Sequence, residues 1–185
     1  MKKTLLGTII ALTVSAVAVP ASAEIGTITI NGKLTAATCT VKVNNGTVDG
    51  VVTLPELPTS MLNEAGKVAG DTSFIMNLTG CTPVAGTVRA YFEHGATVDA
   101  LSGRLNNTNA SGAKNVQVQL LDNAENVLEV GKSSQRANAG TTLKVKEDGD
   151  TTSYADLVYK ARYYATGQST AGELATSVTY SIDYN

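Results

Sequence analysis

The chain has 185 residues, of which 43% are hydrophobic and only 16% are charged, and its formal net charge is −2. Globular proteins usually carry a charge on about a quarter of their residues. Because charge is sparse and the basic residues are scattered, the composition argues against a coiled coil, a disordered acidic tail and a nucleic-acid-binding protein. The length suits one domain, or at most two small ones.

The first 23 residues have the pattern of a secretory signal peptide. Lys2 and Lys3 precede an apolar stretch over residues 5–19, and Ala21 and Ala23 form a small-x-small cleavage motif. No later run is long and apolar enough to span a bilayer as a helix. We therefore expect residues 1–23 to be removed and the mature chain to be exported as a soluble protein.

The first mature segment, residues 26–34, has the alternation of an amphipathic strand. Ile28, Ile30 and Leu34 share one face of that strand. Full burial would contribute about 1.5–3 kcal/mol for each of these side chains, whereas chain termini are usually frayed and polar. This is either the first strand of its own domain or a strand that pairs with another molecule, and composition alone leaves both open.

Short alternating runs separated by Gly, Asn, Asp and Thr fill the rest of the chain, which is typical of an all-β protein. Pro55 and Pro58 indicate an edge or an irregular crossing, because proline donates no ladder hydrogen bond. Residues 60–70 suit a helical turn, and residues 96–113 suit a loop around a short strand. Many short strands in one domain predict a β-sandwich. We expect strands within residues 38–43, 48–54, 74–81, 88–92, 116–120, 127–130, 143–145, 157–163 and 178–184.

Cys39 and Cys81 are the two cysteines of the chain. In an exported protein an even pair favours a disulfide, since the compartment is oxidising. Closing a loop of this length would stabilise the fold by about 4 kcal/mol in the chain-entropy model. The alternative is a pair of buried free thiols.

The sequence offers little material for catalysis or metal binding. His94 is the single histidine and stands beside a glycine at the end of an expected strand, so we interpret it as an exposed turn residue. The acidic run over residues 147–150 lacks the ligand spacing of a calcium loop and fits a hairpin turn. No glycine-rich phosphate loop follows a strand. We expect no enzyme activity, no cofactor, no metal and no small-molecule substrate.

The two ends of the mature chain resemble those of the type 1 fimbrial subunits that Gram-negative bacteria assemble by the chaperone–usher pathway. Residues 26–34, followed five residues later by Cys39, resemble the N-terminal extension of these subunits, and Cys81 closes a strand as in the family. Residues 159–167 resemble the penultimate strand. The C-terminal motif is the most specific signal, because Gly172 is the fourteenth residue from the end and Tyr184 is the penultimate one.

For the fold, the resemblance implies an all-β, incomplete immunoglobulin-like β-sandwich that lacks its last strand. A donated N-terminal strand from a neighbouring subunit completes it. The chain would then divide into a signal peptide (1–23), a donor-strand extension (24–38) and a pilin domain (39–185). The missing edge strand leaves a hydrophobic groove. In the family a periplasmic chaperone fills this groove first, and at the outer-membrane usher the extension of the next subunit replaces the chaperone.

The same resemblance implies roles for residues at both ends. Ile28, Ile30, Gly32 and Leu34 would point into the neighbour's groove, with Gly32 at a shallow point. A bulge at Gly32 is the alternative. Basic chaperone residues would hold the terminal carboxylate. The residues expected to form the acceptor groove and to dock the chaperone are Gly172, Val178, Tyr180, Ile182, Tyr184 and Asn185.

The expected function is that of a structural subunit, most directly the major one, of a surface fimbria that supports cell adhesion. Because each copy donates and accepts a strand, the contact is head-to-tail and builds a filament. Its partners would be identical or related subunits, the chaperone and the usher, without nucleic acid, on a path through the periplasm to the cell surface. The alternatives are a minor adaptor or adhesive subunit and a secreted carbohydrate-binding β-sandwich. A tip adhesin would carry an extra lectin domain, and a carbohydrate-binding module would need clustered surface aromatics.

Overall fold

The computed structural model describes Thr29 and residues 38–185. The expected signal peptide and the donor residues Ile28, Ile30, Gly32 and Leu34 lie outside the described residues, so the boundaries at residues 23 and 38 stay predictions. Within residues 38–185, no helix is long and apolar enough to cross a membrane.

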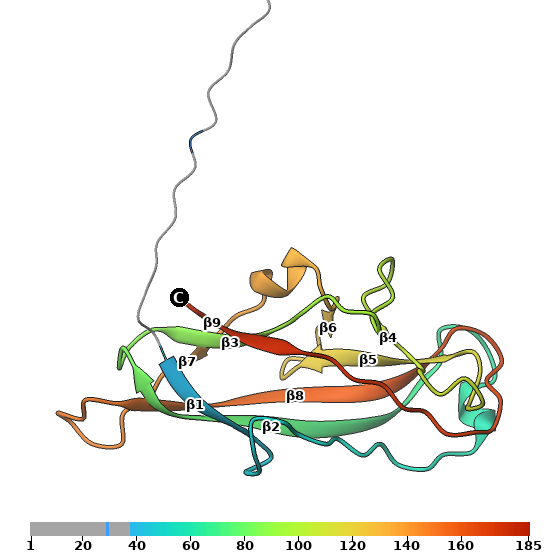
Figure 1. The fold of residues 1–185 in the computed structure, drawn as a ribbon, viewed down its shortest axis with the longest axis horizontal. Helices are drawn as coiled ribbons and strands as arrows, with labels where there is room; N and C mark the ends of the chain where they lie inside the picture. The colour runs from blue at the N-terminus through green and yellow to red at the C-terminus, as the bar shows by residue number, and fades with distance from the viewer. Residues whose placement is uncertain (1–28, 30–37) are drawn as a thin grey trace, which may run out of the picture. The chain divides into compact units, whose positions relative to one another are not determined.

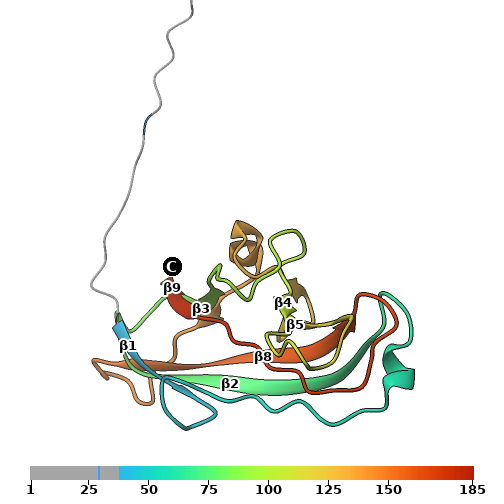
Figure 2. The ribbon, with the colours of Figure 1, turned by 45° about the vertical axis from the view of Figure 1, so that its right-hand side comes forward.

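Two antiparallel sheets make up the described domain (Figures 1 and 2). The larger sheet has the order β1-β2-β8-β5-β4, with β6 paired to β5, and the smaller sheet has the order β7-β3-β9. Two short 3-10 helices lie between strands. The elements are β1 (Thr38–Val43), η1 (Thr59–Leu62), β2 (Val68–Thr82), β3 (Thr87–Phe92), β4 (Leu105–Asn106), β5 (Val116–Asp122), β6 (Val127–Leu128), η2 (Ser133–Ala137), β7 (Thr141–Thr142), β8 (Ser153–Ala165) and β9 (Tyr180–Tyr184).

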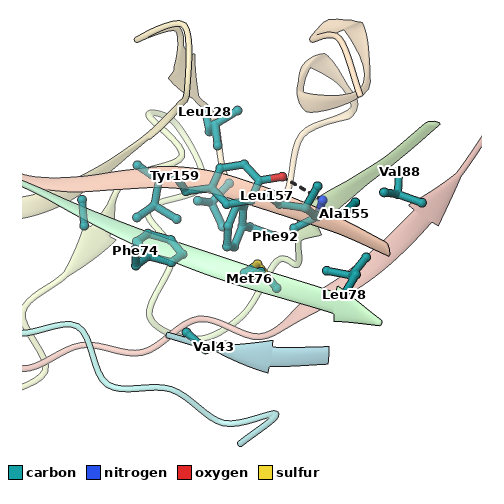
Figure 3. Packing of buried hydrophobic residues seen from close by; sticks show 14 of the residues in the cluster. Val43, Phe74, Met76, Leu78, Val88, Phe92, Leu128, Ala155, Leu157 and Tyr159 are labelled. Atoms are coloured by element: carbon teal, nitrogen blue, oxygen red, sulfur yellow. Dashed lines mark hydrogen bonds between the residues drawn. The ribbon is translucent and has the colours of Figure 1, made fainter. Parts of the chain in front are cut away.

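Alternation along β2 and β8 produces the core between the sheets. Successive side chains of a strand point to opposite faces, so every second residue is buried over residues 74–78 of β2 and 153–161 of β8. Cross-strand neighbours pair apolar with apolar: Phe74 lies opposite Tyr159, and Met76 lies opposite Leu157. Figure 3 shows these side chains between the two sheets, with Phe92 of β3 facing them. Each fully buried side chain of this kind contributes about 1.5–3 kcal/mol.

Three aromatic rings join the two sheets at the centre of this core. The ring centroid of Tyr159 lies 5.1 Å from that of Phe92 and 5.8 Å from that of Phe74. The Tyr159 oxygen also accepts a hydrogen bond from the backbone N–H of Ala90 in β3, at 2.8 Å (Figure 3). Burial raises the pKa of the Tyr159 hydroxyl. A residue of the larger sheet thus supplies a hydrogen-bond partner to the backbone of the smaller one.

Cys39 and Cys81 form a disulfide with an S–S distance of 2.04 Å. It joins β1 to β2 near the position where Thr38 lies opposite Thr82. The bond predicted from the two cysteines is therefore present and connects neighbouring strands of one sheet.

Three of the expected strands differ from the structure. Residues 48–54 form no strand, because their backbone has no ladder partner among the described residues. The last strand begins at Tyr180 rather than at Val178, although the chain before it is also extended. Residues 143–145 make only an isolated bridge, at Lys144, and the strand in that region is β7.

Candidate functional site: a groove between two unpaired edges

A groove of about 770 Å³ opens between two extended segments of the chain. Residues 48–50 and 52–54 line one side and belong to the segment of residues 48–57, which we call the N-terminal wall. Residues 174–180 line the other side, which we call the C-terminal wall. The floor consists of core side chains from both sheets, including Phe74, Met76, Phe92, Leu105 and Val118. The groove therefore opens directly onto the hydrophobic core.

Along the C-terminal wall, hydrogen bonds alternate from residue to residue. The carbonyl oxygens of residues 173, 175 and 179 accept bonds of 2.8–2.9 Å from the backbone N–H groups of Ala113, Thr108 and Glu93, in that order. The carbonyl of Ser177 accepts a bond from the Thr97 hydroxyl. Residues 174, 176 and 178 make no backbone–backbone hydrogen bond within the described part of the chain. The backbone groups of the odd-numbered residues thus bond to the neighbouring loops, and the backbone groups of the even-numbered residues point to the groove side.

The same alternation continues through β9. Asn185 exchanges both backbone hydrogen bonds with Thr87, at 2.9 and 3.0 Å. In an antiparallel pair, residues alternate between positions that exchange these bonds and positions that do not. Tyr180, Ile182 and Tyr184 therefore direct their backbone N–H and C=O groups away from β3, toward the unpaired edge, and their side chains toward the core.

The N-terminal wall is a second unpaired edge. Residues 50–57 make no backbone–backbone hydrogen bond with other described residues. Val52 and Leu54 are half-buried and alternate with exposed neighbours, as in a strand. At Gly50 the chain passes so close to β1 that an added Cβ would lie 2.3 Å from a Val43 methyl carbon, so only glycine fits there. The wall has the geometry of a strand without a neighbour.

Two tyrosines join the N-terminal wall to the rest of the groove. The Tyr180 hydroxyl donates to the Val48 carbonyl oxygen at 2.7 Å, and the Tyr163 hydroxyl donates to the Pro55 carbonyl oxygen at 3.3 Å. Burial raises the pKa of both hydroxyls, and the negative charge of Asp49 adds to this effect at Tyr180. Both hydroxyls therefore stay protonated at neutral pH and act as donors.

The residues that the sequence predicted for this site are only partly brought together. Val178 and Tyr180 line the groove, and Ile182 and Tyr184 pack against the same core cluster beyond it. Gly172 does not line the groove. It lies just before the C-terminal wall at a φ of +146°, and an added Cβ would lie 2.6 Å from the backbone nitrogen of Ala113. A close crossing of two backbones, not groove shape, requires this glycine.

Sequence reasoning missed other parts of the site. Tyr163, Val48 and Leu174 line the groove and were not predicted to do so. Asn107 holds the C-terminal wall in place, because its side-chain amide donates to the Glu173 carbonyl at 2.9 Å and its oxygen accepts from the Ala175 N–H at 3.0 Å. The period-two spacing of Leu174, Thr176 and Val178, with two aliphatic residues around a threonine, was the available signal for the longer wall, whereas the Asn107 contacts leave no local pattern.

Sequence comparisons connect this architecture with fimbrial proteins. The family model for type-1 fimbrial protein A matches residues 54–185. The major fimbrial subunit SMF-1 of Stenotrophomonas maltophilia (strain K279a) is 46% identical over 89% of this chain and 95% of its own length. The F17 fimbrial protein of Escherichia coli is 40% identical over 86% of this chain and 87% of its own length.

Solved structures show the same fold. The P pilus rod subunit PapA has a TM-score of 0.54 and 19% identity, with 79% of this chain and 99% of that chain covered. A type I fimbria protein of Burkholderia pseudomallei has a TM-score of 0.50 and 21% identity, with 80% and 100% covered. These likenesses confirm the expected all-β, immunoglobulin-like sandwich. The chain belongs to the type-1 fimbrial protein family and is a fimbrial subunit.

Proposed function

We propose that this subunit polymerises head to tail by strand donation: residues 24–34 of one copy fill the groove of the next. The observation that carries the proposal is the pair of unpaired edges on either side of an apolar floor. A single inserted strand would bond to even-numbered residues of the C-terminal wall on one side and to residues 50–57 on the other. Strand addition of this kind is established for chaperone–pilin complexes.

The N-terminal segment has the chemistry that the groove requires. Ile28, Ile30 and Leu34 share one face of a strand, with the side-chain-free Gly32 in the same phase. Burying the three aliphatic side chains contributes on the order of 5–9 kcal/mol. The opposite face carries Thr27, Thr29 and other polar side chains that suit a solvent-facing surface. A continuous apolar floor explains why apolar residues stand so close to the expected mature terminus.

Each subunit would donate at one end and accept at the other, so the contact does not close on itself and yields a filament. This role is structural rather than enzymatic, in keeping with relatives that are named as fimbrial subunits. The match to a major subunit favours the major over the minor role. We place residues 1–23 in a removed signal peptide, 24–38 in the donor extension and 39–185 in the acceptor domain.

An empty groove exposes apolar surface and unpaired backbone, which is an aggregation hazard. We therefore include a periplasmic chaperone that covers the groove and an outer-membrane usher at which the next subunit's extension replaces it. The terminal carboxylate of Asn185 would bind basic chaperone residues through charge-assisted hydrogen bonds. The filament would be displayed at the cell surface and support adhesion.

The test compares two charged substitutions on opposite faces of the donor segment. Ile30→Asp places a carboxylate in the apolar groove, where an unpaired charge is costly, and we expect it to abolish fibres seen by electron microscopy. Thr29→Asp, one residue away on the polar face, is the matched control and should leave fibres intact. Both variants should still accumulate as folded, disulfide-bonded subunits. Normal fibres from Ile30→Asp would contradict strand donation by this segment.

A further inference from the structure

The mouth of the groove is crossed by one side chain. Tyr180 belongs to the C-terminal wall, and its hydroxyl donates to the Val48 carbonyl oxygen of the N-terminal wall at 2.7 Å. This hydrogen bond is exposed to solvent, and the tyrosine ring packs against the hydrophobic core below it. One side chain thus joins the two walls of the empty groove.

The acceptor of this bond is held in place by its own loop. The Val43 N–H donates to the Thr47 carbonyl at 2.8 Å, and the Thr47 hydroxyl donates to the Asp49 carbonyl at 2.7 Å. The Asn45 N–H donates to the Asn77 side-chain oxygen in β2 at 3.0 Å. These bonds tie the loop to β1 and β2 before Val48 and join Thr47 to Asp49 across it, so the Val48 carbonyl is presented to Tyr180 by an ordered turn.

A donated strand would need the space that this bridge occupies. A strand paired with the edge of β9 runs about 4.8 Å from it, past the backbone of Tyr180 on the side where Val48 lies. Within the described residues, two side-chain hydrogen bonds link the N-terminal wall to other residues that line the groove. One is the bridge from Tyr180 to Val48, and the other is the longer bond from Tyr163 to Pro55. A donor strand that pairs with both walls would therefore have to pass between Tyr180 and Val48, where the bridge lies.

We propose that the hydrogen bond between the Tyr180 hydroxyl and the Val48 carbonyl is a latch that closes the empty groove and must open before a donor strand enters. The proposal rests on the strand-donation function and adds to it a step that limits the rate at which a donor strand enters the groove. The latch slows the uptake of every donor, whether it comes from a chaperone or from another subunit. It leaves the stability of the filled groove unchanged, because the bond is absent in that state.

The test is Tyr180→Phe, which keeps the ring and removes the hydroxyl. The probe is a fluorescent peptide of residues 24–34, added in excess to the exported chain purified from the periplasm, with binding followed by anisotropy. We expect uptake to be about 2- to 10-fold faster, the factor that corresponds to one neutral hydrogen bond. The melting temperature of the peptide-filled subunit should equal that of the unsubstituted protein. Tyr164→Phe, which changes a tyrosine stacked under Arg104 on the larger sheet, is the control and should leave the rate unchanged.

A second variant weakens the same hydrogen bond by loosening the loop that carries its acceptor, the Val48 carbonyl. Asn77→Ala removes one anchor of the Val48 loop, the bond from the Asn45 N–H, while Tyr180 stays intact, and it should also accelerate uptake. Unchanged or slower uptake in both variants, with normal uptake by the unsubstituted protein, overturns the latch and leaves strand donation standing. If the unsubstituted protein takes up no peptide at all, strand donation and the latch fail together.

Discussion

The paired strands β3 and β9 of the smaller sheet differ in whether their outward-facing backbone groups find hydrogen-bond partners. Three cross-strand pairs allow the comparison. Val88 lies opposite Tyr184, Ala90 opposite Ile182, and Phe92 opposite Tyr180. On the β3 side, every second backbone position finds a partner: Val88 pairs with β7, and the Ala90 N–H donates to the Tyr159 oxygen. On the β9 side, the corresponding backbone groups point toward the unpaired edge, and Tyr180 is the one of the three β9 residues that lines the groove.

A glutamine side chain completes the protected edge. The Phe92 N–H donates to the Gln135 side-chain oxygen at 3.1 Å, and the Gln135 side-chain nitrogen donates to the Phe92 carbonyl at 2.9 Å. The Gln135 amide thus acts as one more residue of a neighbouring strand. Arg89 secures the same loop by donating to the carbonyl of Asn138 at 2.6 Å. An unpaired edge is a hazard that proteins usually cover, and this chain covers one edge with side chains and leaves the other without a neighbour in the described structure.

Filling the open edge should have the largest effect on stability. We expect a chain with residues 24–34 fused after Asn185 through a flexible linker to gain on the order of 5–9 kcal/mol in free energy of unfolding, from burial of the three aliphatic side chains. Denaturant titration of the refolded, disulfide-bonded protein measures this. The same fusion with Ile30→Asp in the fused copy of the segment should gain far less free energy of unfolding. Equal stability of both fusions would mean that the groove does not accept this strand.

Removing the side chain that completes the paired edge of β3 should have an intermediate effect on stability. Gln135 is almost fully buried, and Gln135→Ala leaves the Phe92 N–H without its partner, whereas the Phe92 C=O keeps the bond that it accepts from the Gly131 N–H. Each buried backbone group left unsatisfied costs about 1–3 kcal/mol. Urea unfolding should therefore show a clear loss of stability, whereas the exposed Gln168→Ala should be neutral. A neutral Gln135→Ala would show that the side chain is not the closing element of this edge.

The smallest effect is expected at the surface ion pair that braces η2 against β9. The Arg136 side chain donates to an Asp183 carboxylate oxygen at 2.7 Å and its guanidinium lies over the Tyr91 ring. The Asp183 carboxylate raises the pKa of Arg136. Because the pair is solvent-exposed and screened by salt, we expect Asp183→Asn to lower the melting temperature slightly at low salt and not at high salt. A large loss that persists in high salt would place Asp183 in a structural role beyond this pair.

Periodicity predicted the core of the fold but not the closure of its edges. The alternation of Phe74, Met76 and Leu78 predicted β2 because burial on one face is a local property with period two. The same signal at residues 48–54 predicted a strand that has no ladder in the structure, since the pattern reports one buried face and not the presence of a neighbour. The bonds of Gln135 and Asn107 join residues tens of positions apart, and no local pattern encodes them.

The location of the disulfide has a mechanical consequence. Cys39 lies one residue after the start of β1, which is where a donated extension would join the folded domain. In a filament built by strand donation, pulling force enters each subunit at this point. The covalent bond to Cys81 passes that load directly to β2, a strand of 15 residues hydrogen-bonded to β8 along most of its length. In such a filament the six residues of β1 would not be peeled from the sheet one hydrogen bond at a time, and the longest strand of the subunit would carry the traction.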